Sequence, residues 1–372
     1  MTITFFSFLL NHHQIGLCKS FAKEVGVDFR FVQTGKLTEE RKRMNFNQFK
    51  ENYVVDANDN IEEAYRLCME SDVVIAGVVN QNWINERISK NLITFAYKER
   101  FLKGVAIQAF SPAFIKNGYL NYFRFRNKKM YFLCASVFTA KDTMLIYPRP
   151  TKKFKWGYFP QRDNVEFNEI LESKIKLKCL CVARFLDWKR IDDAIGAIVN
   201  LRKEGYNVTL DIVGSGEKER KLRELVKINK AENYICFLGN LVPEEVRAKM
   251  READIFIFPS NRKEGWGAVL NEAMSSGCAC VASHDAGSSL YLISHGENGL
   301  IFKTASVKDL TQKIRILLDD EKYLLEIQKN AYQTIINEWN ENIAVKRFIE
   351  VCKALVNNEI IPMYEKGPMS RA

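Results

Sequence analysis

The chain has 372 residues, which predicts two domains, or three, at about 150 residues per domain. Its composition, 47% hydrophobic and 27% charged, is ordinary for a folded globular protein and excludes disordered and fibrous classes. The net charge of +10 lies entirely in residues 1–160, which hold 24 Lys and Arg against 14 Asp and Glu. This asymmetry predicts an anionic partner: nucleic acid, an anionic membrane or a phosphorylated substrate.

Apolar runs in the first half predict strands separated by helical segments. The expected strands are Ile3–Leu10, Val27–Gln33, Val73–Gly77, Leu92–Tyr97 and Tyr131–Ser136. The first run has neither the basic flank nor the cleavage site of a signal peptide, and no run approaches the roughly 20 apolar residues that span a bilayer. We therefore expect a cytoplasmic protein.

The second half alternates strands and helices more clearly. The expected strands are 178–183, 208–213, 234–238, 254–259 and 278–283, and the expected helices are 192–203, 217–229, 243–250 and 268–276. This alternation predicts an α/β fold with two Rossmann-like, doubly wound parallel sheets whose domains face a cleft. Ligands of such sheets bind at the carboxyl ends of the strands.

Prolines and a polar run mark the junction between the two halves. Pro148, Pro150 and Pro160 precede the polar stretch 161–169. We place the first domain at 1–165 and the second at 166–339, and we expect a final helix at 340–360 to pack back on the first domain. None of the nine cysteines forms a C-x-x-C pair, so we expect free, buried thiols.

The strongest candidate site is Glu264-Gly265-Trp266-Gly267 followed by Glu272, at the end of a strand and into a helix. The glycines allow a ligand to approach the backbone closely, and a helix start attracts an anion. Glu272 can accept hydrogen bonds from a cis-diol such as ribose, and Glu264 lies where a sugar could bind. Taken alone, the spacing fits a solvated loop glutamate and a glutamate on the helix surface better than it fits a binding site.

Two cations, Arg184 and Lys189, follow the strand 178–183 and suit a pyrophosphate. Gly214-Ser215-Gly216 forms a tight turn that could lie near a nucleotide phosphate, although a partial glycine motif is weak evidence. The chain has no D-x-D pattern and no His-rich metal motif. We therefore expect no metal or other cofactor, and protein cations to neutralise any bound diphosphate.

The first half carries two further candidates. Asn11, His12 and His13 end the first strand, and Glu99 and Arg100 end another, where a second substrate could bind. The segment Lys116–Lys129 interleaves five cations with aromatic residues and lacks acids. This chemistry suits an anionic membrane surface or single-stranded nucleic acid, and a core helix with solvated cations is the alternative.

In order along the chain, the motifs of residues 178–305 resemble the donor domain of GT-B glycosyltransferases of the GT4 family. They are Val182-Ala183-Arg184 with Lys189, Ile212–Gly216, Phe237-Leu238-Gly239, Ala253–Ser260, Glu264–Gly267 with Glu272–Gly277, and Gly296–Phe302. The first half resembles enzymes of bacterial capsule, exopolysaccharide or O-antigen synthesis through Asn11–Gln14, Tyr97–Arg100, Leu133–Ala140 and Lys155–Pro160.

The resemblance implies a retaining, metal-independent hexosyltransferase that uses a nucleotide-diphosphate sugar, with UDP favoured. It implies that Arg184, Lys189 and Glu264 are catalytic, Glu264 contacting the transferred sugar, and that Glu272 holds the ribose. Phe237 and Leu238 would pack the base, with Gly214, Gly265, Trp266 and Gly267 completing the donor site. The family's Gly-rich loop after the first strand and its histidine after the fifth are replaced here by Asn11–Gly16 and Tyr97–Arg100.

The resemblance also implies an acceptor that is lipid-linked or a polysaccharide. Together with the basic first half, it predicts a first domain that binds the acceptor at an anionic inner-membrane surface through Lys116–Lys129. The alternatives are an inactive nucleotide-sugar-binding or scaffold protein and a phosphorylase- or synthase-like enzyme of the same fold. The neutral second half and the lack of a known nucleic-acid module argue against nucleic acid as a partner.

Overall fold

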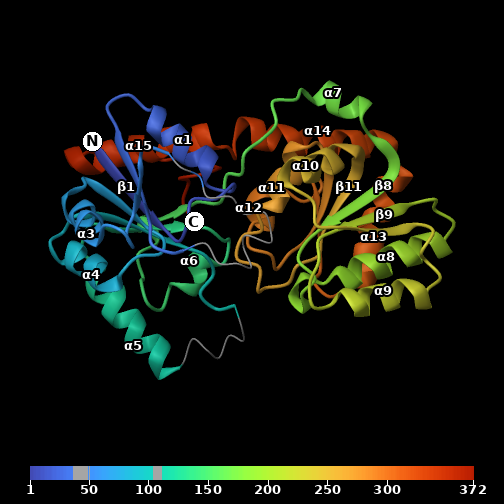
Figure 1. Cartoon of the computed structure of the whole chain (residues 1–372), viewed down its shortest axis with the longest axis horizontal. Helices are drawn as coiled ribbons and strands as arrows, with labels where there is room; N and C mark the ends of the chain where they lie inside the picture. The colour runs from blue at the N-terminus through green and yellow to red at the C-terminus, as the bar shows by residue number, and fades with distance from the viewer. Residues whose placement is uncertain (37–48, 50, 104–110) are drawn as a thin grey trace. The chain divides into compact units, whose positions relative to one another are not determined.

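The computed structural model describes residues 1–36, 49, 51–103 and 111–372. The chain divides into two compact units, Met1–Gln161 with Glu338–Ala372, and Arg162–Asn337. Each unit is a parallel sheet with helices on both faces (Figure 1). The structure thus confirms the predicted α/β class with two Rossmann-like parallel sheets.

In the described part of the first unit, seven parallel strands follow the order β3-β2-β1-β4-β5-β6-β7. Their bounds are β1 Thr2–Ser7, β2 Asp28–Gln33, β3 Val54–Asp56, β4 Val73–Ala76, β5 Ile93–Lys98, β6 Met130–Cys134 and β7 Lys153–Lys155. Sequence analysis misses the three-residue strands β3 and β7, because such short edge strands carry almost no period-2 pattern. The order reverses between β1 and β4, and ligands of doubly wound sheets bind at such reversal points, outside the carboxyl ends of the strands.

The helices of the first unit are α1 Ile15–Lys23, α3 Ile61–Glu70, α4 Gln81–Ser89, α5 Pro112–Asn121, α6 Thr139–Asp142 and α15 Glu341–Asn357, with 3-10 turns η2 Phe123–Phe125 and η3 Pro150–Lys152. The final helix α15 packs beside α1 through Phe348, whose ring lies 5.6 Å from Phe21 and 4.8 Å from Phe95 of β5. Beyond α15 the chain reaches β7, where Met369 donates its backbone N–H to Lys155 and Ser370 accepts from it.

The described part of the second unit has six parallel strands in the order β10-β9-β8-β11-β12-β13. Their bounds are β8 Ile175–Val182, β9 Thr209–Val213, β10 Ile235–Gly239, β11 Ala253–Phe258, β12 Ala279–Ser283 and β13 Leu300–Phe302. The helices are α7 Phe167–Glu172, α8 Ile191–Lys203, α9 Glu219–Ile228, α10 Pro243–Glu252, α11 Val269–Ser275, α12 Ser289–Leu292, α13 Val307–Asp319 and α14 Glu321–Asn337, with the turn η4 Asp187–Lys189.

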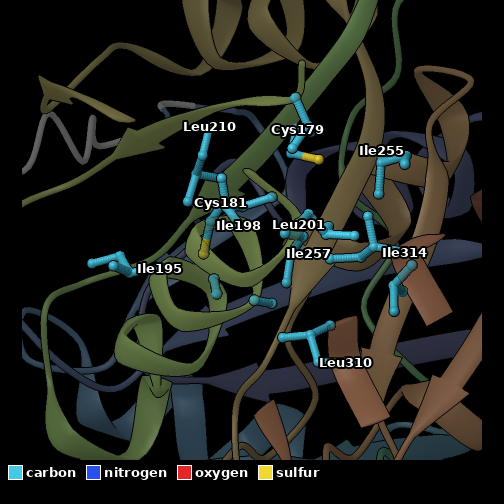
Figure 2. Packing of buried hydrophobic residues seen from close by; sticks show 14 of the residues in the cluster. Cys179, Cys181, Ile195, Ile198, Leu201, Leu210, Ile255, Ile257, Leu310 and Ile314 are labelled. Carbon is cyan, nitrogen blue, oxygen red and sulfur yellow. The ribbon is translucent and has the colours of Figure 1, made fainter. Parts of the chain in front are cut away.

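The core of the second unit shows why these runs form a buried sheet. Alternate residues of a strand share a face, so Cys179 and Cys181 of β8 lie on the same side as Ile255 and Ile257 of β11 (Figure 2). They pack against the apolar stripes of α8 and α13, which contain Ile195, Ile198, Leu201, Leu310 and Ile314. Helices α10, α11 and α14 cover the opposite face (Figure 1). Because both faces are covered, the strands read as nearly continuous apolar runs.

All nine cysteines are free thiols, as expected. Eight are buried, but Cys236 on the edge strand β10 is exposed, which corrects the expectation that all nine are buried. No helix in the described part of the chain is both long and apolar enough to cross a membrane.

Candidate functional site

The carboxyl ends of β8 and β11 bring two predicted residues into contact. Lys189, in the turn η4 after β8, forms an ion pair with Glu264, in the loop after β11. Both side chains are about nine-tenths buried, at 12% and 9% exposure. The loops are also joined through their backbones, because Asn261 donates its N–H to the Trp188 carbonyl at 2.9 Å. A cation and a carboxylate therefore lie side by side at the reversal point of the sheet order.

Arg184 directly follows β8 and is exposed. Among the described residues its side chain has no ion pair, in contrast to Lys189 nearby in sequence. The two residues predicted to bind the pyrophosphate therefore differ in their surroundings. Lys189 is paired with a carboxylate, whereas the Arg184 side chain is exposed to solvent. Both residues lie in the loop that follows the carboxyl end of β8.

Gly214 and Gly216 are required by close packing of the chain on itself. Gly214 has φ +128°, and a Cβ there would lie 2.0 Å from the Ala183 carbonyl oxygen. Gly216 has φ +155°, with a Cβ position 2.7 Å from the carbonyl oxygen of Phe185. The turn is tied to the loop after β8 by the Phe185 N–H, which donates to the Ser215 carbonyl at 2.8 Å. These glycines fix the loop that carries Arg184.

The buried side chain of Trp266 holds the loop after β11 in place. Its side chain is buried, and the indole N–H donates to Asn271 Oδ1 at 2.9 Å. Gly267, at φ +90°, leaves a Cβ position 2.3 Å from the Phe258 ring, so a larger residue would displace that ring. Gly265 is buried beside them. The tryptophan and the glycines therefore set the course of the loop that presents Glu264.

Glu272 lies on α11 and is 8% exposed. Burial raises the pKa of its carboxyl to about 7, and the positive charge of Arg247 opposes this rise. Within the described chain no hydrogen bond or ion pair reaches its carboxylate. A buried carboxylate without donors is costly, because such groups normally accept hydrogen bonds. The site thus offers acceptors for hydroxyl groups.

Phe237 and Leu238 of β10 are half-buried at the end of the edge strand. The Phe237 ring lies edge-on to Phe185, 5.9 Å away, and the Arg223 guanidinium stacks over it at 4.5 Å. Both residues therefore present apolar surface next to the loop after β8.

In the first unit, Asn11, His12 and His13 form a compact turn between β1 and α1. The Asn11 side chain accepts the His13 N–H at 2.9 Å, and the two imidazole rings lie 3.8 Å apart. Burial, helped by the neighbouring His12, lowers the pKa of His13 to about 3, so its imidazole is neutral at physiological pH. Among the described residues, its buried Nδ1 has no hydrogen-bond partner. Gln14 donates to Ser7 at 3.0 Å.

Glu99 and Arg100 follow β5 and differ in their surroundings. Glu99 accepts the Tyr158 hydroxyl at 3.0 Å and pairs with Lys103 at 2.8 Å. Arg100 is largely buried, 3.6 Å from Asp142 and stacked on Phe138. Its guanidinium is therefore engaged inside the unit, whereas Glu99 remains partly accessible.

The segment Lys116–Lys129 divides between surface and core. Ile115, Tyr119 and Leu120 of α5 are exposed, and Gly118 contacts Ile146 so closely that a Cβ would lie 2.2 Å from it. This contact places α5 beside the exposed Met144 and Leu145. Phe125 is buried instead, and the Lys128 and Lys129 ammonium groups donate to Ser89 and Asn358. The aromatic residues thus serve partly as core and partly as surface.

Two charged residues near Glu272 are not found by sequence analysis. Arg247 of α10 donates to Asp163 at 2.8 Å, and Arg251 pairs with the same carboxylate. The partners are separated by more than 80 positions in the sequence, and no local pattern joins them. The described residues contain no group of three or more His, Cys, Asp or Glu side chains suited to hold a metal ion.

Comparison with known proteins agrees with this geometry. Residues 163–334, which carry Arg184, Lys189, Glu264 and Glu272, match the family described as glycosyl transferases group 1. The second unit is thus similar to the glycosyl transferases group 1 family over most of its length. The predicted resemblance to this family is confirmed, and the matched range coincides closely with the unit Arg162–Asn337.

The curated relatives include named glycosyltransferases. An uncharacterized glycosyltransferase of Methanocaldococcus jannaschii is 31% identical over 50% of this chain and 47% of its own length. Protein CapJ of Staphylococcus aureus is 32% identical over 57% and 52%. The N,N'-diacetylbacillosaminyl-diphospho-undecaprenol alpha-1,3-N-acetylgalactosaminyltransferase of Campylobacter jejuni is 30% identical over 56% and 52%. The chain thus spans about half the length of the curated relatives that it matches.

Solved structures share the fold over nearly the whole chain. Anabaena HepE in complex with UDP aligns with a TM-score of 0.66 at 15% identity, covering 96% of this chain and 100% of that one. The pneumococcal O-GlcNAc transferase GtfA, in complex with UDP and GlcNAc, aligns with a TM-score of 0.66 at 13% identity, covering 96% and 99%. At these identities the likeness shows the fold, which is the GT-B arrangement of two parallel-sheet α/β domains.

Proposed function

We propose that the protein is a retaining glycosyltransferase that moves a sugar from a UDP-sugar to a lipid-linked or polysaccharide acceptor in bacterial surface polysaccharide synthesis. The observation that carries the proposal is the buried Lys189–Glu264 pair at the reversal point of a group 1 domain. The names of the relatives support the pathway, since one acts on an undecaprenol-linked substrate and another is a capsular polysaccharide biosynthesis glycosyltransferase.

In the proposed complex, the donor diphosphate takes the place of Glu264 as the partner of Lys189. Arg184 supplies the second cation, and together they stabilise the charge that grows on the leaving nucleotide. Glu264, released from the ion pair, accepts hydrogen bonds from the hydroxyls of the transferred sugar. Without the donor, the ion pair keeps both buried charges compensated.

Glu272 accepts the ribose hydroxyls, and Phe237 and Leu238 pack the base. The proton of the acceptor hydroxyl passes to the departing phosphate on the same face of the sugar, so the retaining step needs no protein base. We propose that the reaction also needs no metal ion, because Arg184 and Lys189 neutralise the diphosphate.

The first unit binds the acceptor in this proposal. Asn11, His12 and His13 lie in the turn between β1 and α1, and Glu99 directly follows β5; they supply neutral and anionic hydrogen-bonding groups. The exposed apolar residues of α5, with Lys116 and Arg124 nearby in sequence, hold this unit against an anionic inner-membrane surface. Arg100, engaged with Asp142, orders the loop after β5.

A panel of UDP- and GDP-sugars tests the proposal through donor hydrolysis and thermal stabilisation. We expect at least one UDP-sugar to stabilise the protein and to be hydrolysed slowly, with activity unchanged in EDTA. Arg184→Ala and Lys189→Ala should lower turnover more than binding, because the charge on the leaving group grows in the transition state. Failure of every nucleotide sugar to bind, or activity that EDTA abolishes and Mg²⁺ restores, would contradict it.

A further inference from the structure

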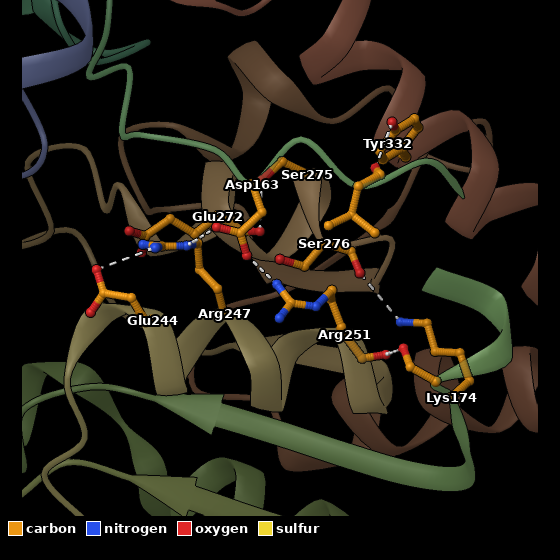
Figure 3. Close-up of polar contacts among 11 residues, drawn as sticks. Asp163, Lys174, Glu244, Arg247, Arg251, Glu272, Ser275, Ser276 and Tyr332 are labelled. Atoms are coloured by element: carbon orange, nitrogen blue, oxygen red, sulfur yellow. Dashed lines mark hydrogen bonds and ion pairs between the residues drawn. The ribbon is translucent and has the colours of Figure 1, made fainter. Parts of the chain in front are cut away.

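Arg247 lies at the centre of a charged cluster on one side of α10. Glu244, Arg247 and Arg251 are spaced by three and four residues and therefore share one face of the helix. The Arg247 Nε donates to Asp163 Oδ1 at 2.8 Å, while its terminal nitrogen reaches Glu244 at 3.5 Å (Figure 3). The Arg247 side chain is 9% exposed, so these partners fix its guanidinium in one position.

Glu272 belongs to the same cluster but has no direct bond in it. Its helix α11 packs against α10, and the Arg247 charge acts on its carboxylate (Figure 3). Arg251 pairs with the other oxygen of Asp163 and does not act on Glu272. Two arginines thus share Asp163, and one of them is coupled to the proposed ribose ligand.

We propose that Arg247 is a positioning residue for the nucleotide site: Asp163 fixes its guanidinium beside helix α11, and the charge of the guanidinium in turn orients the Glu272 carboxylate to accept the ribose hydroxyls. This inference rests on the proposed function of Glu272. It assigns a role in ligand binding to a side chain that does not itself touch the nucleotide.

Electrostatics indicates what Arg247 contributes. Burial raises the pKa of Glu272 to about 7, and Arg247 opposes this rise, so removing Arg247 would leave more of the carboxyl protonated at neutral pH. A protonated carboxyl is a weaker acceptor than a carboxylate. Figure 3 labels the titratable groups around Glu272, which come from α10, from α14 and from the segment before β8: Asp163, Lys174, Glu244, Arg247, Arg251 and Tyr332. Among them, the Arg247 charge is the one that lowers the pKa of Glu272.

Calorimetric titration of UDP between pH 5.5 and 8.5 tests the inference on the full chain. We expect wild-type affinity to fall as the pH drops through about 7 and Glu272→Gln to lose this dependence. Arg247→Gln should move the midpoint upward and weaken UDP binding severalfold at pH 7, because less of the Glu272 carboxyl is then ionised at that pH. Arg251→Gln is the matched control, because it removes the other arginine from Asp163 and should leave the midpoint in place.

A measurement without nucleotide separates the two proposals. If the wild type does not bind UDP at any pH, the proposed function fails. Thermal unfolding measured at several pH values then tests the Arg247–Glu272 coupling. If the coupling exists, the loss of stability caused by ionisation of Glu272 should occur at a higher pH in Arg247→Gln than in the wild type. If UDP binds and the midpoint is the same in wild type and Arg247→Gln, the inference is overturned while the proposed function stands.

Arg247→Lys provides a second variant in case Arg247→Gln does not fold. Lysine keeps the charge but loses the planar, multidentate contact with Asp163. We expect an unchanged midpoint and severalfold weaker UDP binding at pH 8.5, where Glu272 is ionised in both proteins. Wild-type affinity at that pH would contradict the positioning role.

Discussion

Gly214 packs against the loop that carries Arg184. The sequence and the structure suggest different reasons why this position requires glycine. The sequence motif points to a phosphate, whereas the structure places the Gly214 backbone against the Ala183 carbonyl. A glycine can be required by the protein's own packing and still serve a ligand site, because it fixes the loop that presents the cation.

Gly214→Ala should lower the free energy of unfolding by more than about 2 kcal/mol, because it combines an unfavourable φ with a clash against backbone. Gly205→Ala is the matched control: Gly205 also has a positive φ, +98°, but a Cβ there meets nothing within 4 Å. We expect this control to cost about 1 kcal/mol. Urea unfolding of both variants measures the difference, and equal losses would show that the close approach is not rigid.

Glu272 should make the stability of the protein depend on pH. Its pKa is about 7 in the folded state and near 4.5 when exposed, so the folded state holds the proton more tightly between these values. Its contribution is therefore fully present below about pH 4.5 and is lost as the pH rises through 7, on the order of 3 kcal/mol in total.

Glu272→Gln should remove this part of the pH dependence, measured by denaturant unfolding at pH 5 and pH 8. The difference in stability between the two pH values should be smaller in the variant than in the wild type by that amount. An identical pH profile in both proteins would contradict the assigned pKa. Glu264→Gln is the comparison variant. In the wild type, the Glu264 carboxylate differs from that of Glu272 because it forms an ion pair with Lys189.

At the scale of elements, α5 carries a testable apolar surface. Ile115, Tyr119 and Leu120 are exposed at 55%, 55% and 37%, and burying an exposed large apolar side chain gains about 1.5–3 kcal/mol. Replacing all three with Ser should abolish sedimentation with anionic vesicles at low salt and leave folding intact. Ile61→Ser on α3, another exposed apolar residue of the same unit, should have no effect.

Zwitterionic vesicles and high salt complete this test of the membrane proposal. Binding to anionic but not zwitterionic vesicles, reduced by salt, is expected where cations assist apolar insertion. If the wild type ignores anionic vesicles at low salt, α5 does not dock on a membrane, and the basic first half must serve a soluble anionic acceptor.

The observed bounds of the strands and helices show which parts of the fold can be predicted from the sequence. Strands β8 to β12 and helices α8 to α11 lie within a few residues of their predicted bounds, because apolar runs and helical periodicity are strong there. Helices α7, α12, α13 and α14 of the same unit are not predicted. Candidate site residues can be named from the sequence where a motif is local, as in Glu264–Glu272, and their roles stay predictions. Contacts between residues that are distant in the sequence are not predicted. No sequence pattern links Asp163 to Arg247, and none indicates that Arg100 lies beside Asp142.

For the whole molecule, the central claim is that the second unit binds a nucleotide diphosphate. It explains why the net positive charge lies in the other half: the donor site needs only Arg184 and Lys189, within a unit whose overall charge is close to balanced. We therefore propose that the donor and the anionic surface are bound by different parts of the chain.

Calorimetric titration of UDP and of uridine into the wild type, Arg184→Ala, Lys189→Ala and Glu272→Ala tests this claim most directly. Glu272→Ala should weaken both ligands by about 1.5–3 kcal/mol, the value of hydrogen bonds to a charged group. The two cation variants should weaken UDP but not uridine, because only UDP carries the diphosphate. Wild-type affinity for UDP in all three variants would contradict the account.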